Sequence, residues 1–267
     1  MISIKELEEK RNYLTTLRSF TEEEQEYLRK EFIIGNTRTL EVAEKAYTRE
    51  QKLLCITDEW SEKEAIKANE ILSYFWELVG IMRVHEYINN VLEEEATGNY
   101  EWILSEDILK WVNRIILDQY YYLSPLEKGF YREYGKASLG MNPLPEYSVF
   151  RPRLIALLDW YGKTESDLIS KLAAFHLSFE VDVHPFYDGN GRTGRAIMNL
   201  ELARKGFPLI NLKYNDFQKY DYSFNEYRES NKMDTMQDLI GQELNKELDN
   251  QIMVKEKKLV ISKTNSN

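Results

Sequence analysis

A twelve-residue segment, HPFYDGNGRTGR at positions 184–195, concentrates the residue types that could carry out chemistry. It lies between two stretches of helical periodicity, so its second half is expected to begin a helix. The first turn of a helix presents unpaired backbone N–H groups and a positive dipole end, which attract anions. Glycines at 189 and 191 carry no Cβ, so a phosphate group could approach the backbone closely. The segment therefore predicts a phosphate site.

The side chains of the segment extend this prediction. Arg192 and Arg195 are three residues apart, which places them on one face of the first helical turn, where both can clamp phosphate oxygens. Asn190 can donate a further hydrogen bond, and Asp188 suits a divalent cation bridging to phosphate. His184 titrates near neutral pH and is the natural general base. These groups predict a polyphosphate cradle beside a base, suited to nucleotidyl or phosphoryl transfer.

Each of these features also has an ordinary structural alternative. Glycine pairs occur in loops that bind nothing, a histidine before a proline often caps or packs, and two arginines on a helix usually form a solvated face. Phe186 fits a structural role, because an apolar side chain here would pin the loop to the core. The functional interpretation is preferred because all the polar groups fall within twelve residues in a workable order.

Composition narrows the class of protein. The chain has 267 residues, 43% of them hydrophobic, and a net charge of -10, which argues against a general binder of nucleic acid or of membrane surfaces. Cys55 is the single cysteine, so no internal disulfide can form, as is usual in a reducing compartment. The N-terminal residues lack the apolar stretch of a secretory signal, and no run has the length of a transmembrane helix. We therefore expect a cytoplasmic protein.

The pattern of apolar residues predicts an all-α fold. Glycine and proline are scarce, at 12 and 6, and residues 1–34 contain neither. Thr21 with Glu24, and Ser61 with Glu64, have the spacing of capping boxes. Gly80 is expected to end or interrupt the helix that contains it. Further helices are expected over 105–121, 165–183, from about 191 to Gly206, and 233–259.

The exception to helical periodicity lies between 129 and 152, where glycine and proline gather. This stretch predicts a loop with a short hairpin. Three regions result: an N-terminal helical extension over 1–100, a core over 101–242, and a charged helical tail over 243–267. No Pro/Gly/Ser-rich linker separates them, so the extension is expected to pack on the core.

The segment at 184–195 resembles the Fic (Fido) signature His-x-Phe-x-Asp/Glu-Gly-Asn-Gly-Arg-x-x-Arg at every defined position. The preceding KLAAFHLSFEVDVHPF and the earlier SEDILKWVNRIIL and GFYRE are also similar to this family, so the resemblance covers about 101–242. It implies a Fic-type helical bundle with a β-hairpin flap at about 129–152. It also implies transfer of AMP from ATP to a Ser, Thr or Tyr hydroxyl of a target protein, with release of pyrophosphate.

The resemblance assigns a role to each residue of the motif. It implies that His184 deprotonates the target hydroxyl and that Asp188 holds Mg²⁺. Asn190 would line an anion hole with the backbone of Gly189 and Gly191. Arg192 would grip the β-phosphate, Arg195 the γ-phosphate, and Gly194 belongs to the same nucleotide-binding stretch.

The partners follow from the same resemblance. The adenine wall is expected to include Tyr220 or Tyr222, and the flap would position the target segment by strand addition. Self-modification and a homodimer are both compatible with it. A Fic-fold transferase with another phosphate-containing donor and a nucleotide-sensing regulatory module are the alternatives. The unaltered Gly-Asn-Gly-Arg-x-x-Arg favours ATP and AMP transfer.

Many members of the family carry an inhibitory helix with the pattern Ser/Thr-x-x-x-Glu-Gly/Asn, whose glutamate pairs with the second motif arginine. The similar stretch here is RKEFIIGNTRTL, but it has Ile34 at the glutamate position and Lys30 at the Ser/Thr position, and Glu31 is one turn away. We therefore expect the brake to be absent or non-standard and Arg195 to be free. Natural divergence or an engineered substitution would equally explain Ile34.

Other titratable residues receive weaker interpretations. His176 lies on the apolar face of the helix before the motif, so a hydrogen-bonded core residue is favoured over a second base. No partner is evident for His85, Cys55 or Asp182, and no cysteine–histidine metal spacing exists.

Overall fold

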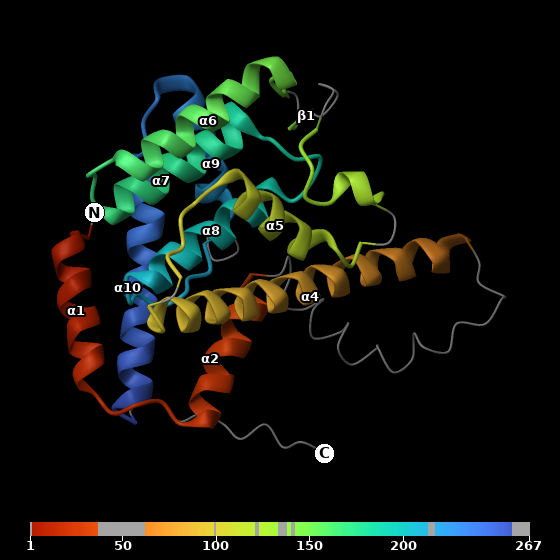
Figure 1. The fold of residues 1–267 in the computed structure, drawn as a ribbon. Helices are drawn as coiled ribbons and strands as arrows, with labels where there is room; N and C mark the ends of the chain where they lie inside the picture. Colours follow the sequence, from red (N-terminus) through yellow and green to blue (C-terminus); the bar gives the residue numbers. More distant parts are fainter. Residues whose placement is uncertain are drawn as a thin grey trace.

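The computed structural model describes residues 2–36, 62–98, 100–120, 123–132, 138–139, 142–212 and 217–257, and these are mostly helical (Figure 1). The elements in chain order are α1 (Ile4–Thr16), α2 (Glu22–Gly35), α4 (Glu62–Ala96), α5 (Glu106–Leu117), the 3-10 turn η1 (Pro125–Glu127), β1 (Ser138–Leu139), β2 (Asn142–Pro143), α6 (Tyr147–Lys163), α7 (Leu168–Ser178), the π-helical turn η2 (Phe179–Val183), α8 (Asn190–Arg204), α9 (Phe217–Ser230) and α10 (Asp234–Lys255). The expected all-α class is confirmed.

Helix α8 lies at the centre of the fold and is covered on nearly every side (Figure 1). On one side, apolar residues of α4, α5 and α6 form a hydrophobic cluster with it, including Val84, Leu109 and Phe150. On the other side, a second cluster draws on α1, α9 and α10, including Leu7 and Leu244. Both clusters contain residues of α7 and α8, so these two helices are the shared centre of the core.

Helix starts follow the sequence signals closely, whereas one glycine was misread. Thr21 accepts a hydrogen bond from the Glu24 backbone while the Glu24 carboxylate accepts from the Thr21 backbone, so this capping box is confirmed; Ser61 lies outside the described residues. Gly80 does not end α4, which runs through it. A Cβ at Gly80 would lie 2.6 Å from the carbonyl oxygen of Ile116, so this glycine lets α4 and α5 cross closely.

The ends of the described chain pack together. Helix α1 lies along α10, and α2 packs on α4 (Figure 1). Helix α10 crosses position 242 without a break. The extension therefore joins the core, as expected, while the boundaries at 100 and 242 remain predictions.

The stretch between 129 and 152 is only partly a loop. Strands β1 and β2 pair antiparallel, with Ser138 opposite Pro143 and Leu139 opposite Asn142. The predicted loop is too long at its end, because α6 begins at Tyr147 and contains Pro152. Buried Phe150 and Leu154 belong to an apolar stripe that outweighs the hydrogen bond lost at the proline. In the ranges described, no helix combines the length and the apolar character needed to cross a bilayer.

Candidate active site

The motif forms the link between α7 and α8. Helix α7 continues into the π-turn η2, the chain then passes through His184, and Gly189 caps the start of α8. In η2 the backbone N–H of His184 donates to the carbonyl of Phe179, five residues back, at 2.8 Å. An α-helix would have used the carbonyl of Glu180 instead. The π-turn thus leaves that carbonyl available to another donor.

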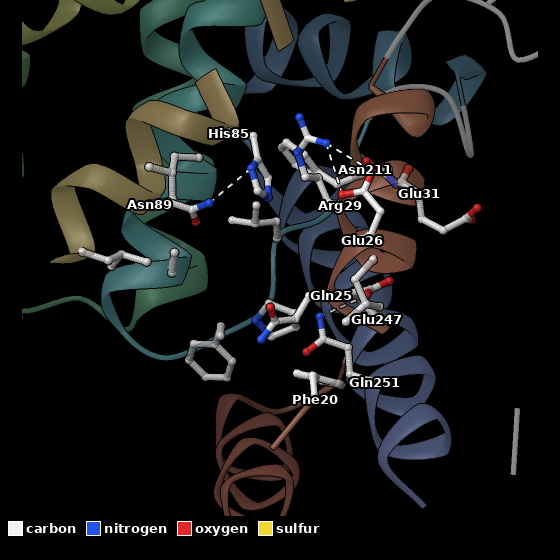
Figure 2. Close-up of a pocket in the computed structure, with 18 of the residues that line it drawn as sticks. Phe20, Gln25, Glu26, Arg29, Glu31, His85, Asn89, Asn211, Glu247 and Gln251 are labelled. Atoms are coloured by element: carbon white, nitrogen blue, oxygen red, sulfur yellow. Dashed lines mark hydrogen bonds and ion pairs between the residues drawn. The ribbon is translucent and has the colours of Figure 1, made fainter. Parts of the chain in front are cut away.

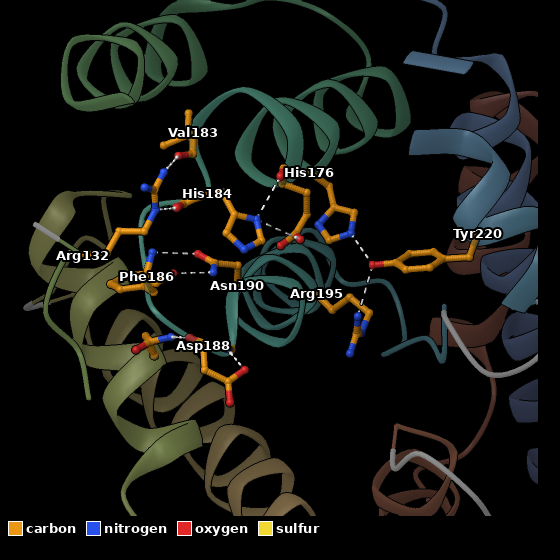
Figure 3. A network of polar contacts seen from close by, with 12 residues as sticks. Arg132, His176, Val183, His184, Phe186, Asp188, Asn190, Arg195 and Tyr220 are labelled. Atoms are coloured by element: carbon orange, nitrogen blue, oxygen red, sulfur yellow. Dashed lines mark hydrogen bonds and ion pairs between the residues drawn. The ribbon is translucent and has the colours of Figure 1, made fainter. Parts of the chain in front are cut away.

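The released carbonyl holds the imidazole of His184. Nδ1 lies 3.0 Å from the carbonyl oxygen of Glu180, and because a carbonyl only accepts, Nδ1 carries the proton and Nε2 has a lone pair. Burial lowers the pKa of His184 to about 4, so the ring is neutral at pH 7. The Glu180 carboxylate oxygen Oε2 lies 3.8 Å from Nδ1. Figure 3 shows the His184 ring within this polar network. The His184 ring is therefore neutral and oriented, with an unprotonated Nε2.

The loop after His184 is held by its own residues. Asn190 accepts from the Phe186 backbone N–H and donates to the Phe186 carbonyl, both at 2.9 Å (Figure 3). Phe186 is fully buried and packs on Tyr131, as expected of an anchor. The Asn190 side chain therefore closes the loop, whereas the sequence suggested that it would face the anion.

A buried arginine that the motif does not contain supports the histidine from the flap side. Arg132 is fully buried, and its Nε donates to the His184 carbonyl oxygen at 2.6 Å. Its backbone N–H donates to the carbonyl of Pro185 at 2.9 Å, and its guanidinium lies 4.6 Å from the centre of the Phe150 ring. The first residues of the expected flap are thus tied directly to the base.

Asn113 of α5 joins three parts of the site. Its amide nitrogen donates to the carbonyl of Asp188 at 2.9 Å and to Thr193 at 3.2 Å, and its oxygen accepts from the backbone of Gly129 at 3.0 Å. Asn113 was missed at the sequence level. Its signal was a polar residue within the apolar stripe of an amphipathic helix that includes Leu109.

The two motif arginines reach different partners rather than forming one clamp. Arg192 donates to the hydroxyl of Tyr120 and, at 3.0 Å, to Asp188. Arg195 donates to the hydroxyl of Tyr220 at 3.1 Å. Both arginines are buried, with 7% of Arg192 and 4% of Arg195 exposed. They lie in the first turns of α8, where the helix dipole is positive. The start of α8 is therefore strongly electropositive.

We expected Tyr220 or Tyr222 to face the adenine of the nucleotide, but the Tyr220 side chain is not exposed. It is buried, and its hydroxyl lies between Arg195 and His176, whose Nε2 is 2.7 Å away (Figure 3). Burial lowers the pKa of His176 to about 3, so this residue is a neutral core histidine, as favoured. Tyr222 is 58% exposed on α9. The sequence could not distinguish these tyrosines, because their roles depend on which face of α9 meets α7.

The three motif glycines do different things. Gly189 has a φ of 78°, the left-handed region that suits glycine at the start of α8. A Cβ at Gly191 would lie 3.3 Å from Arg195 Nη1, so its smallness makes room for that guanidinium. A Cβ at Gly194 would overlap the His176 ring. We expected Gly194 to contact the nucleotide, but its position is explained by the close packing of α8 on α7.

Comparison with known proteins identifies this arrangement. Residues 103–202 match the family described as the Fic/DOC family. The matched residues carry a Fic domain. It is 31% identical over 163 residues to a protein adenylyltransferase Fic of Nematostella vectensis, covering 60% of this chain and 35% of that protein. It is 32% identical over 147 residues to a probable protein adenylyltransferase of Aquifex aeolicus, covering 52% and 41%. The chain spans less than half the length of these relatives.

Solved structures share the fold of this Fic-domain protein. A Fic domain containing signaling protein from Bacteroides thetaiotaomicron has a TM-score of 0.67 at 19% identity, covering 97% of this chain and 99% of that one. A fragment of Fic-1 from C. elegans also has a TM-score of 0.67, at 18% identity, covering 94% and 70%. At such identities the likeness shows the fold, and a Fic-type helical architecture is confirmed.

Asp188 is the candidate metal ligand of the Fic motif. Its side chain is 44% exposed, and its Oδ1 accepts from the Gly189 backbone and pairs with Arg192. Throughout the described ranges, no group of three or more histidine, cysteine, aspartate or glutamate side chains could hold a metal alone. Mg²⁺ at nucleotide sites commonly uses one or two carboxylates, with phosphates and water completing the shell. One exposed carboxylate beside the start of α8 is therefore compatible with a Mg²⁺ whose other ligands are phosphate and water.

The stretch that resembles the inhibitory helix is α2. It ends at Gly35, where a Cβ would overlap the Asn211 side chain, and Asn36 donates to the same Asn211. Ile34 is half-buried in the last turn, and Glu31 is exposed. Arg195 is not free as we expected, because Tyr220 holds it.

Of the other singled-out residues, two lie in the described part of the chain. Asp182 has partners that the sequence did not reveal, because it accepts from Ser178 at 2.9 Å and from Tyr227 at 2.8 Å and so joins η2 to α9. His85 is half-buried on α4, and Cys55 falls outside the described residues.

Proposed function

We propose that this Fic-domain protein is a protein adenylyltransferase that transfers AMP from ATP to a hydroxyl side chain of a target protein. The observation that carries the proposal is the imidazole of His184, neutral, with its Nδ1 proton bound to the Glu180 carbonyl and its Nε2 unprotonated. Such a base stands beside a helix N-terminus that carries two buried arginines. The relatives named protein adenylyltransferase support the same choice of reaction.

In the proposed reaction the target hydroxyl oxygen attacks the α-phosphorus of ATP. Its proton passes to Nε2 of His184, the bond from the α-phosphorus to the bridging oxygen breaks, and pyrophosphate leaves with that electron pair. The imidazolium that forms lies beside the Glu180 carboxylate, 3.8 Å from Nδ1, which stabilises its charge. Glu180 is thus a positioning residue for the base.

The charge that develops on the phosphates is met by the start of α8. Its first backbone N–H groups have no helical acceptor, and Arg192 and Arg195 supply two fixed cations. Tyr120 and Tyr220 hold these side chains through neutral hydroxyls, and Arg192 also pairs with Asp188. Asp188 would hold Mg²⁺, which would offset the negative charge of the phosphates.

The target is proposed to dock along the flap, where β1 and β2 offer a short edge for strand addition. Arg132 and Asn113 connect the base of this flap to the motif, so a docked strand would be placed relative to His184. Self-modification and a homodimer belong to the same proposal. Of the described residues, exposed Tyr187 lies within the motif loop and is one hydroxyl that a second copy could present.

The test is a transfer assay with labelled ATP and Mg²⁺. We expect label from the α-position, and none from the γ-position, on the protein itself or on a lysate protein. His184→Ala should reduce transfer by about 10³-fold while ATP still binds, because only the base is lost. His85→Ala is the matched control and should transfer normally. Transfer of γ-label would indicate a kinase-like reaction, and binding without any transfer would indicate a nucleotide-sensing module; either result rejects the proposal.

We also propose that α2 exerts no carboxylate brake on Arg195, since Ile34 replaces the glutamate that the family pattern has there. Ile34→Glu should lower transfer, and Ile34→Gln should lower it much less, because only the charged side chain competes with phosphate for Arg195. Equal activity of the two variants would show that residue 34 does not face the nucleotide.

A further inference from the structure

A cavity lies at the opposite end of α8 from the motif. It has a volume of about 710 Å³ and is enclosed by α2, α4, α10 and the segment after α8 (Figure 2). Ala203 and Gly206 mark where α8 ends beside it. The 15 residues of α8 span about 20 Å, and no residue of 184–195 lines the cavity. Its size is typical of sites for small molecules.

The floor of this cavity is apolar. Phe32 of α2, Ile88 of α4 and Phe207 after α8 are buried beneath it. Phe20 and Leu209 extend the same surface. A ligand that fills the cavity would therefore present a flat or aliphatic body to these side chains.

The walls carry an excess of negative charge. The lining residues include one arginine, Arg29, and no lysine. They include four glutamates: Glu22, Glu26, Glu31 and Glu247. Arg29 contacts both carboxylate oxygens of Glu26 at 3.2 Å, so this pair is matched. Burial lowers the pKa of His85, which leaves that ring neutral at pH 7. Three carboxylates thus face the cavity without an equal number of cations.

Glu247 is the most enclosed of these carboxylates. Its oxygens accept hydrogen bonds from the amides of Gln251, at 3.1 Å, and Asn250, at 3.5 Å. Within the described part of the chain, no lysine or arginine forms an ion pair with it. Burial raises its pKa to about 7. Figure 2 shows Glu247 and Gln251 on the α10 wall, across from α2. A cation in the cavity would remove the cost of ionising this group.

We propose that this cavity binds a small organic cation, with its ammonium or guanidinium group at Glu247 and Glu31 and its apolar body on Phe32 and Phe207. The site is separate from the proposed transfer chemistry, and its failure would leave that chemistry untouched.

Occupancy would act first on α2. This helix supplies Glu31 and Phe32 to the cavity, and its last residues dock through Gly35 and Asn36 on Asn211, which also lines the cavity. A ligand that joins α2 to α10 should therefore hold this docked end in place. We expect binding to raise the melting temperature of the protein.

The first experiment compares three probes of one shape and different charge on the whole chain at pH 8. These are 2-phenylethylamine, 2-phenylethanol and phenylacetate, each titrated by calorimetry and by thermal unfolding. The ammonium is expected to bind at least tenfold more tightly than the alcohol, and the carboxylate is expected not to bind. Equal affinities, or no binding of the ammonium at millimolar concentration, would overturn the proposal.

The second experiment changes the carboxylate. Glu247→Gln keeps the shape and hydrogen bonding of the side chain, and it is expected to weaken binding of 2-phenylethylamine at least tenfold. Glu229→Gln is the control, because this residue is exposed on α9 and does not line the cavity. An affinity that survives Glu247→Gln in a folded protein would show that the ammonium does not lie at Glu247.

The pH dependence supplies an independent readout. Glu247 is faced by Tyr27 and Glu31 from α2 and by Lys246 from its own helix, with Arg29 and His85 on the cavity wall. Since the bound cation favours the ionised carboxylate, affinity should rise about tenfold between pH 6 and pH 8, as Glu247 ionises with its pKa of about 7. Affinity that is flat over this range would contradict the assignment of Glu247.

Discussion

Enclosed charged side chains lie near both ends of α8, and they carry opposite charges at the two ends. At the N-terminal end, Arg192 and Arg195 are buried and bound to the hydroxyls of Tyr120 and Tyr220. At the C-terminal end, Glu247 is largely enclosed and bound to amides of Gln251 and Asn250. In each case part of the hydrogen-bonding demand of a charged group is met by a neutral partner.

The positive end of the α8 dipole carries arginines and suits an anion. The cavity beside the other end is lined by carboxylates of α2 and α10 and suits a cation. Tyrosine hydroxyls and amides meet part of the hydrogen bonding of these ions without adding an opposite charge. Arg192 also pairs with the Asp188 carboxylate, whereas Arg204 nearby is held between two carboxylates, those of Glu95 and Glu201. Under the two proposals made above, the ligand supplies opposite charge at each end.

The largest expected effect on stability comes from crowding the N-terminal end of α8. Gly194→Ala places a methyl group against the His176 ring, so we expect a loss of about 3 kcal/mol in the free energy of unfolding, measured by denaturant titration. Gly162→Ala in α6 is the control, because nothing lies within 4 Å of its Cβ position, and it should be neutral or slightly stabilising. If Gly194→Ala were as stable as Gly162→Ala, α8 and α7 would not be packed as described.

The next effect removes a neutral partner. Tyr220→Phe deletes the hydroxyl that Arg195 and His176 share, so about 2 kcal/mol of stability should be lost and ATP should bind several-fold more weakly. Tyr222→Phe is the control on the same helix and should change neither quantity, since that ring is exposed. Weaker ATP binding by Tyr222→Ala would instead restore this residue to the adenine wall.

A smaller effect is expected from changing the carboxylate beside the His184 imidazole. Glu180→Gln removes the carboxylate near Nδ1 while keeping the backbone carbonyl, so we expect kcat to fall about tenfold with ATP affinity unchanged. The acid limb of the pH–rate profile should move to lower pH, because an imidazole without a neighbouring anion has a lower pKa. Asp182→Asn, two residues on, should leave that limb in place. An unmoved limb in Glu180→Gln would remove Glu180 from the mechanism.

The smallest effect concerns the other end of the helix. Burial raises the pKa of Glu247 from 4.5 to about 7, so its contribution to stability is full below pH 4.5 and is lost as pH rises through 7. Glu247→Gln should therefore raise the melting temperature by a few degrees at pH 8 and hardly change it at pH 5. Glu229→Gln should not alter the pH dependence. A destabilised Glu247→Gln protein at pH 8 would show that this carboxylate is already neutralised by a cation.

Local signals in the sequence anticipated much of this fold. Apolar periodicity located the main helices, the Thr21 capping box marked the start of α2, and the motif was correctly placed between two helices. Each of these features depends on residues within one or two turns. The phosphate-facing roles of His184 and the motif arginines remain predictions, now with a defined geometry.

What the sequence could not supply were contacts across long separations. Tyr120 reaches Arg192 from 72 residues away, and Tyr220 reaches Arg195 from 25. Neither pairing has a local signal, since both depend on which helices pack together. Gly80 was misread for the same reason, and the packing role of Gly194 was not foreseen, because a glycine needed for close helix packing resembles one needed for a turn or a ligand.

The π-turn before His184 gives the chain one residue more than a continuous α-helix would require over the same distance. A protein shortened by one residue within 179–183 could run as an unbroken helix, regain regular backbone bonding and gain rigidity. Its imidazole, however, would lose its carbonyl support, because the backbone N–H of the histidine would then bond to the carbonyl four residues before it. The extra residue therefore keeps the Glu180 carbonyl available to orient the imidazole, and the backbone gives up regular α-helical bonding at this point.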